Sequence, residues 1–186
     1  MTQEAFPDSW PRVWRGESSG DLFESFDLGK THVGVGFFFA LSHEHAQFYA
    51  GHGTQPRAFV LDPGNTLNLC DPYLAWREPA ARQVLEDVSE NFDEWVCRHS
   101  GEERDLISYL DAGDLYDYEG NGSGQRWNSL FRTARAAGYD SVCVRDYTDG
   151  VKGEDSVVWV VFEPGRIHAD PNRPVPEAPR ARKPGW

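Results

Sequence analysis

The sequence predicts an α+β fold with a mostly antiparallel sheet in one globular domain. Strand-like runs occur near both ends of the chain and helical patterns fill its middle, without the regular strand–helix alternation of a parallel sheet. The 186 residues suffice for one hydrophobic core. An aromatic content of 13%, with seven Trp, argues against a disordered chain.

The first 70 residues are expected to hold four strands and two short helices. The predicted strands share apolar runs bounded by Pro, Gly or polar residues, and they cover 11–16, 36–40, 57–62 and 66–69. A turn at 63–65 separates the last two. A short helix or helical turn is expected at 20–30. A second helix is expected at 43–50, where Ser42 is suited to cap the first turn.

The middle of the chain, about residues 71–120, is expected to be an acidic helical insert. It holds 14 Asp or Glu against four Lys or Arg, so it carries −10 of the net charge of −12. Pro79 suits the first turn of a helix. Apolar residues then recur on one helical face at Val84, Leu85, Val88, Phe92, Trp95 and Val96. A capping box at Ser100 to Glu103 predicts a second helix.

The remainder is expected to form a third helix and two strands, which complete a domain of residues 1–168. The helix carries apolar residues at Trp127, Leu130, Phe131 and Ala134. Gly138 is suited to end this helix, and strands are expected at 140–145 and 156–162. From Pro164 onward the chain holds six of its 12 prolines without apolar periodicity. Residues 169–186 are therefore expected to be a Pro-rich tail.

Composition favours a cytoplasmic protein with a protein partner. The three cysteines are an odd number with no pair close in sequence, which favours reduced thiols. No signal peptide or membrane-spanning apolar run is visible. An acidic surface repels a phosphate backbone, which disfavours direct nucleic-acid binding. The acidic residues are either solvated helix faces or a face that docks a basic protein.

One segment, Gly36 to Ala50, predicts a strand that turns directly into a helix. Phe38 lies on the strand and Tyr49 near the end of the helix, so both rings could meet one flat ligand. Upstream, an apolar strand ends in Arg15 followed by Gly16. A glycine lets a ligand approach the main chain closely.

These two segments resemble the nicotinamide pocket of the ADP-ribosyltransferase superfamily. In that family NAD lies across a cleft between two small antiparallel sheets, and its carboxamide bonds to the backbone of a glycine after the first strand, here Gly16. A strand of Gly-apolar-aromatic-Phe-Ala and a helix ending in Tyr follow in the family, as they do here without a gap. The resemblance implies split sheets around an NAD cleft, with Phe38 and Tyr49 stacking on the nicotinamide.

Two positions depart from the poly(ADP-ribose) polymerase branch, which has His and Tyr where this chain has Arg15 and Phe38. Arg15 is similar to the arginine of the toxin-like branch, which anchors the NAD phosphates or the adenosine ribose. Two roles are open for Ser42. It could hydrogen-bond the nicotinamide ribose, or it could only cap its own helix.

The catalytic acid departs further from the family. Most members open the last core strand with Glu, and this chain has Val158 there. The chain resembles a phage branch of anti-CRISPR ADP-ribosyltransferases from the third helix onward, which has an acid at the end of the preceding strand. That position is Asp146, which is therefore the catalytic candidate. Glu154 and Asp155 are the reserves.

A metal site is not expected. His43, His45 and His52 cluster in sequence, but only His45 and His52 share a helical face and no thiol lies near. The resemblance implies transfer of ADP-ribose from NAD to a protein acceptor with release of nicotinamide, and no metal is expected to take part.

Three alternatives stay open. They are an NAD glycohydrolase toxin, a related phosphotransferase, and a catalytically dead transferase fold that binds a partner through its acidic face. A phage effector or anti-CRISPR role in a bacterial or phage-infected cell follows only from the partial resemblance.

Overall fold

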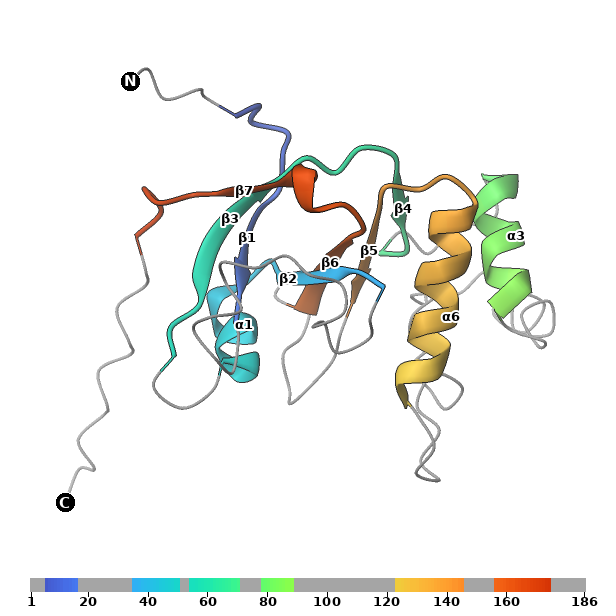
Figure 1. Cartoon of the computed structure of the whole chain (residues 1–186), viewed down its shortest axis with the longest axis horizontal. Coiled ribbons are helices and arrows are strands. Elements are labelled where there is room, and N and C mark those ends of the chain that lie inside the picture. The colour runs from blue at the N-terminus through green and yellow to red at the C-terminus, as the bar shows by residue number, and fades with distance from the viewer. Residues whose placement is uncertain are drawn as a thin grey trace.

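A computed structural model describes residues 6–16, 35–50, 54–70, 78–88, 123–145 and 156–174. These residues form a seven-stranded sheet with helices packed on it, which confirms the α+β class (Figure 1). The strands are β1 Arg12–Arg15, β2 Phe37–Ala40, β3 Arg57–Leu61, β4 Thr66–Asn68, β5 Ser141–Arg145, β6 Val157–Val161 and β7 Ile167–Ala169. The helices are α1 His43–Tyr49, α3 Pro79–Val88, α6 Ser123–Ala136 and the 3-10 helix η6 Pro164–Arg166.

The strand order is β4-β5-β6-β2-β1-β3-β7, and the sheet is antiparallel except between β4 and β5. The expectation of a mostly antiparallel sheet is confirmed, whereas the parallel pair was not anticipated. β4 is only three residues long, and its parallel pairing places Asn68 beside Cys143.

The sheet has a weak junction between its two halves. β1 pairs with β3 at four positions and β2 pairs with β6 at four, but β1 and β2 pair only at Trp14 and Ala40. The expected two sheets are thus one continuous sheet, in which β4-β5-β6-β2 and β1-β3-β7 are joined at one position. We call this position the sheet junction.

The α-helices cover one face of the sheet. Around β5 and β6, this face packs against α6 and α3 through a core that includes Val160, Phe131 and Val84. At the junction, α1 packs on Trp14 and Ala40 through Ala46. The opposite face carries a second core cluster, made of Val13, Phe37, Phe39, Phe59, Leu61 and Val161. Among the described residues, no helix is long and apolar enough to cross a membrane.

The predicted helix ends agree with the structure where it describes them. Ser42 caps α1, since its Oγ accepts a hydrogen bond from the His45 N–H at 3.1 Å. α3 begins at Pro79 as expected. Gly138 has a φ of 88°, in the left-handed region that favours glycine after a helix. The predicted helical segment at 20–30, the helix at Ser100 and the rest of the insert lie outside the described residues.

The sequence analysis missed β7, which pairs with β3 at three positions and adds an edge strand after the last expected one. Besides this pairing, Ile167 packs on the core of the opposite face and ion pairs anchor the segment, so no apolar periodicity marks it in the sequence. Arg166 donates to Asp62 at 2.8 Å and contacts Asp140 at 3.0 Å. Asp170, 8% exposed, pairs with Arg12 at 2.8 Å. Residues 164–174 are therefore part of the folded domain.

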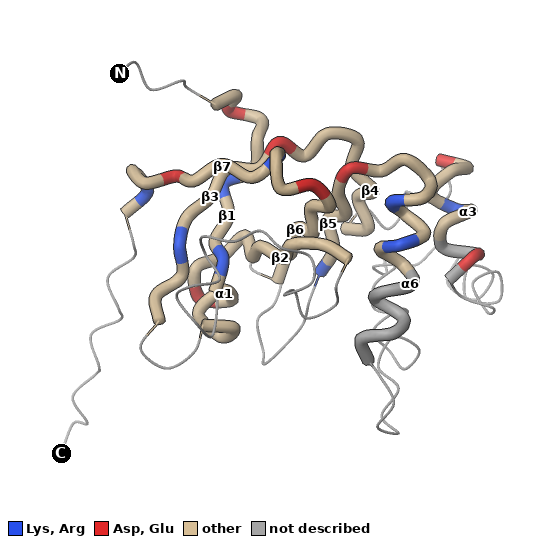
Figure 2. The backbone as a smooth tube through the Cα atoms, viewed as in Figure 1, with Lys and Arg blue, Asp and Glu red and all other residues tan. Residues whose placement is uncertain are grey.

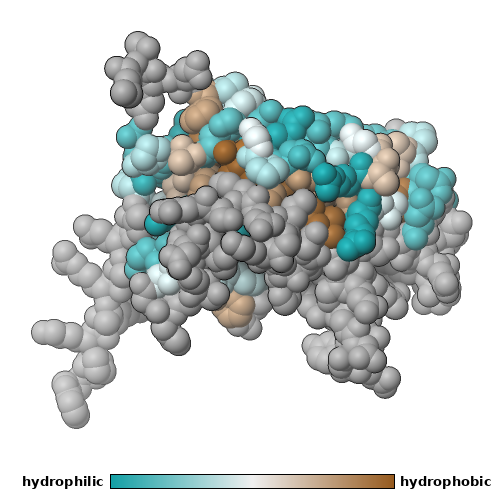
Figure 3. Space-filling model, viewed as in Figure 1, coloured by the Kyte–Doolittle hydropathy of each residue, from teal (hydrophilic) through white to brown (hydrophobic). Residues whose placement is uncertain are grey.

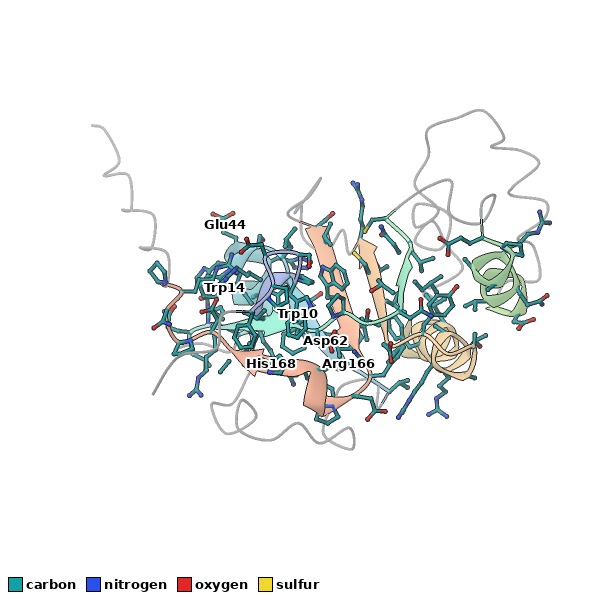
Figure 4. The ribbon with its side chains drawn as sticks, turned by 90° about the horizontal axis from the view of Figure 1, so that it is seen from above. Trp10, Trp14, Glu44, Asp62, Arg166 and His168 are labelled. Carbon is teal, nitrogen blue, oxygen red and sulfur yellow. The ribbon has the colours of Figure 1, made fainter. Side chains whose placement is uncertain are left out.

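Acidic residues gather along one rim of the sheet, whereas basic residues are spread over several elements (Figure 2). Figure 2 shows acidic residues along the upper rim, near η6 and above β4, and basic residues on β1, β3 and α6. In the face shown in Figure 3, hydrophilic residues cover most of this rim and apolar ones show beneath them. Asp62 and Arg166 lie side by side there (Figure 4).

Replacing Arg166 with Met should lower the free energy of unfolding by about 1–2 kcal/mol, because two carboxylates, Asp62 and Asp140, lose their shared cation. The matched control is Arg135→Met, which removes a more exposed ion pair with Glu163. The control substitution should lower the free energy of unfolding by about 0.5 kcal/mol or less. Urea unfolding of both variants measures the difference, and equal effects would contradict the proposed anchor.

Candidate functional site

The candidate site lies where β1 and β2 separate. Beyond the paired position of Trp14 and Ala40, the antiparallel register brings Arg15 opposite Phe39 and Gly16 opposite Phe38, but the described strands form no pairing there. Among the described residues, the strand pairing between β1 and β2 is thus limited to one position. A flat polar ligand could bond to the main chain where the pairing ends.

Gly16 packs against α1. A Cβ built on Gly16 would lie 1.8 Å from the carbonyl oxygen of Ala46 and 2.8 Å from the backbone nitrogen of Ala50. From the sequence, this glycine was predicted to let a ligand approach the main chain closely. The structure adds a second reason, because the helix backbone occupies the space of a side chain. No signal in the sequence reveals this contact, since it joins segments 30 residues apart.

Arg15 is buried, with 7% of its surface exposed. Its guanidinium lies over the rings of Phe37 and Phe39, 5.7 and 5.5 Å from their centroids. Because side chains alternate along a strand, Arg15 lies on the face opposite to Phe38. A buried cation beside the junction suits an anionic ligand group, and the role of Arg15 in holding NAD phosphates stays a prediction.

Phe38 and Tyr49 have different neighbours. The Phe38 ring is edge-on to Phe131 of α6 at 5.4 Å. Tyr49 is 46% exposed and lies 5.6 Å from the ring of His45 and 5.2 Å from that of Phe48. Both residues come from elements that meet at the junction, but stacking of both rings on one ligand stays a prediction.

Ser42 and the histidines of α1 have structural contacts. Ser42 caps the helix as described, so its role at a ribose stays a prediction. His45 is fully buried. Within the described ranges, no group of three or more His, Cys, Asp or Glu is placed to hold a metal ion. His52 lies outside those ranges.

The structure reveals a cluster that the sequence analysis missed, in which Trp14 lies between His43 and Arg173. The Arg173 guanidinium lies 4.7 Å from the Trp14 ring centroid, and the His43 ring is edge-on to it at 4.8 Å. Nε2 of His43 and Nη1 of Arg173 are buried and have no hydrogen-bond partner in the described part of the chain. Two buried polar atoms of this kind suit a bound anionic or polar group.

We call these three residues the Trp14 cluster. Arg173 follows β7 in the Pro-rich region, 159 residues after Trp14, so no sequence pattern linked it to the site. Trp14 and Arg15 are neighbours on β1 and point to opposite faces. Basic groups therefore lie on both sides of the sheet junction.

Burial lowers the pKa of His43 below its ordinary value of 6.5, and nearby Arg173 adds to this effect while Glu44 opposes it. The unfolded chain then takes up the proton at a higher pH than the folded chain. The stability that neutral His43 contributes is complete above about pH 6.5 and is lost as the pH falls through the folded pKa. The melting temperature should therefore fall between about pH 7.5 and about pH 5.5, and fall less in His43→Gln. Equal pH dependence in both proteins would contradict this prediction.

The catalytic candidate Asp146 directly follows β5 and lies outside the described residues, as do Glu154 and Asp155. Val158, which the resemblance aligns with the Glu of most family members, is 5% exposed and pairs with Ala40 on one side and Val144 on the other. Its side chain belongs to the core under the helices.

Comparisons with known proteins find little. No family model matches the chain, and no curated protein matches it. A crystal structure of an anti-CRISPR protein is similar at 14% sequence identity over 87% of this chain and 94% of that chain, with a TM-score of 0.47. A likeness at this level carries no conclusion about fold or function.

Proposed function

We propose that this protein is an NAD-dependent mono-ADP-ribosyltransferase that moves ADP-ribose from NAD to a protein acceptor and releases nicotinamide. The observation that carries the proposal is the sheet junction. Strand pairing ends at Trp14 and Ala40, two positions before Gly16 and Phe38, the residues that the family resemblance assigns to the nicotinamide. NAD supplies the activated glycosidic bond. Residues of the chain would bind the NAD, orient it and stabilise the charge that develops as the bond breaks.

The residues at the junction fit such a ligand. The backbone of Gly16 would bond the carboxamide, and Phe38 and Tyr49 would flank the ring. Arg15 and the Trp14 cluster supply cationic or polar groups on either side of the junction, which suits the phosphates of a dinucleotide. Ser42, the cap of α1, would lie near the nicotinamide ribose.

Asp146 would complete the chemistry. Cleavage of the bond to nicotinamide places positive charge on the ribose, which a carboxylate stabilises. The same carboxylate can accept the proton of the attacking nucleophile. In this chain the acid would act from the end of β5, because Val158 makes the usual position apolar.

The acceptor is proposed to be a protein with a basic surface. The insert at about 71–120 carries −10 of the net charge of −12, so it attracts basic surfaces and repels nucleic-acid backbones. The sequence resemblance to phage-type transferases supports a role as a phage effector, such as an anti-CRISPR, inside the host cell.

A second candidate is a binding module without catalysis. It is favoured by Val158, an apolar residue buried at the position where the family has its acid. In this case the acidic insert would dock a partner without transfer.

Incubation with NAD labelled on its adenylate part, in a bacterial lysate, distinguishes these functions. Label that becomes covalently attached to protein supports transfer. Label recovered as free ADP-ribose identifies an NAD glycohydrolase instead. Intact NAD throughout would contradict both activities and favour the binding module. Mass spectrometry of the labelled peptides identifies the acceptor residue.

A further inference from the structure

Two cysteines that are distant in sequence lie next to one another in the sheet. Sγ of Cys70 is 3.6 Å from Sγ of Cys143, although 73 residues separate them. The parallel pairing of β4 and β5 fixes this arrangement, since Asn68 pairs with Cys143 and the Leu69 N–H donates to the Cys143 carbonyl at 2.8 Å. Spacing along the chain gives no sign of this pair, since the two cysteines are brought together only by the order of the strands.

We propose that Cys70 and Cys143 form a redox-active dithiol site, which closes to an intramolecular disulfide by exchange with a small-molecule disulfide. A disulfide bond is about 2.05 Å long, so the sulfurs must approach by roughly 1.5 Å. Cys70 lies in the turn after β4, where side-chain rotation and small backbone shifts allow this approach. Its N–H is bonded to Oδ1 of Asn68 at 3.1 Å, within the same turn.

The two thiols have different roles because their surroundings differ. Cys70 is partly exposed, whereas Cys143 is buried at 5% exposure. The hydrogen bond with Cys70 and burial both raise the pKa of Cys143, and nearby Arg145 opposes them. Cys70 is thus the thiol that a small disulfide can reach, and Cys143 is the one that resolves the mixed disulfide.

The exchange balances with glutathione disulfide as oxidant. The Cys70 thiolate attacks one sulfur of glutathione disulfide, which forms a mixed disulfide and releases one glutathione thiolate. Cys143 then loses its proton and attacks Sγ of Cys70, which releases the second glutathione. The protein loses two hydrogens and the oxidant is reduced to two glutathione molecules.

The disulfide would join the two ends of the segment that contains the acidic insert, because residues 71–142 lie between the cysteines. In a reducing compartment the pair stays a dithiol and closes only when small disulfides accumulate. The site does not depend on the proposed transfer reaction, and its test does not involve NAD.

The test uses the full chain with Cys97, which lies outside the described residues, replaced by Ser. The protein is treated with glutathione disulfide, remaining thiols are alkylated, and peptides are mapped by mass spectrometry. The expected product has lost two hydrogens, carries no glutathione and yields a linked Cys70–Cys143 peptide. In Cys143→Ser, glutathione should stay on Cys70, and in Cys70→Ser, Cys143 should stay unmodified.

Two results would overturn the proposal. One is glutathione that stays on Cys70 while Cys143 is present, and the other is no reaction of either thiol. Because the chain with both cysteines gives the decisive peptide, a variant that fails to fold does not obscure the answer.

Discussion

Gly16→Ala is expected to destabilise the protein by about 3 kcal/mol and to abolish NAD-dependent activity. The added Cβ would lie 1.8 Å from the carbonyl oxygen of Ala46, which is backbone and cannot rotate away. α1 must therefore move off β1. Because α1 carries Ser42 and Tyr49, its displacement would disrupt the proposed nicotinamide pocket together with the fold.

The matched control is Gly165→Ala in η6, where an added Cβ meets no atom within 4 Å. The free energy of unfolding of this variant should lie within about 0.5 kcal/mol of that of the unchanged protein. Urea unfolding of both variants gives the comparison. A stable Gly16→Ala protein with full activity would mean that α1 does not pack on β1 as the structure places it.

Asp146→Asn is expected to slow ADP-ribosyl transfer about 100- to 10,000-fold. The substitution keeps the size of the side chain and removes the charge that stabilises the developing cation. NAD binding should be little changed, since Asn still fills the same space. The measurement is the rate of transfer at saturating NAD, together with a melting temperature to verify folding.

Glu154→Gln and Asp155→Asn are the matched controls for Asp146→Asn, and both should keep most of the activity. If Asp146→Asn retains full activity while one of these two loses it, the acid lies in the segment before β6. If all three retain activity, a carboxylate from this region takes no part in the reaction.

Local features of the chain predicted the local structure well. The strand at β2 passes directly into α1, with Ser42 as the cap, as Gly36 to Ala50 indicated. Runs of apolar residues predicted β1, β5 and β6, because most of their side chains are buried. These signals depend on neighbours within a few residues, so a single sequence contains them.

Contacts between distant segments could not be predicted in this way. β7 is held by Arg166 with Asp62 and Asp140, which are 104 and 26 residues away along the chain. Ion pairs of this kind have no periodicity. The same holds for Arg173 against Trp14 and for the Cys70–Cys143 pair, since each depends on the order of strands in the sheet.

The sequence predicted where Arg15 and Gly16 lie along the chain, but not how the junction around them is arranged. Arg15 and Gly16 do lie at the end of β1, beside the point where β1 and β2 separate. Alternation along β1 and β2 places Arg15 and Phe38 on opposite faces, which a ligand crossing the junction would have to span. The Trp14 cluster adds polar groups on the helix-covered face that the family resemblance did not suggest.

Release of free nicotinamide from NAD tests the central claim most directly. The full chain is incubated with NAD in a host lysate, and nicotinamide is quantified by chromatography against a matched incubation without the protein. We predict release that rises with protein concentration, persists in Gly165→Ala and is lost in Asp146→Asn. No release above that of the lysate alone would contradict the proposal that the sheet junction is a catalytic nicotinamide site.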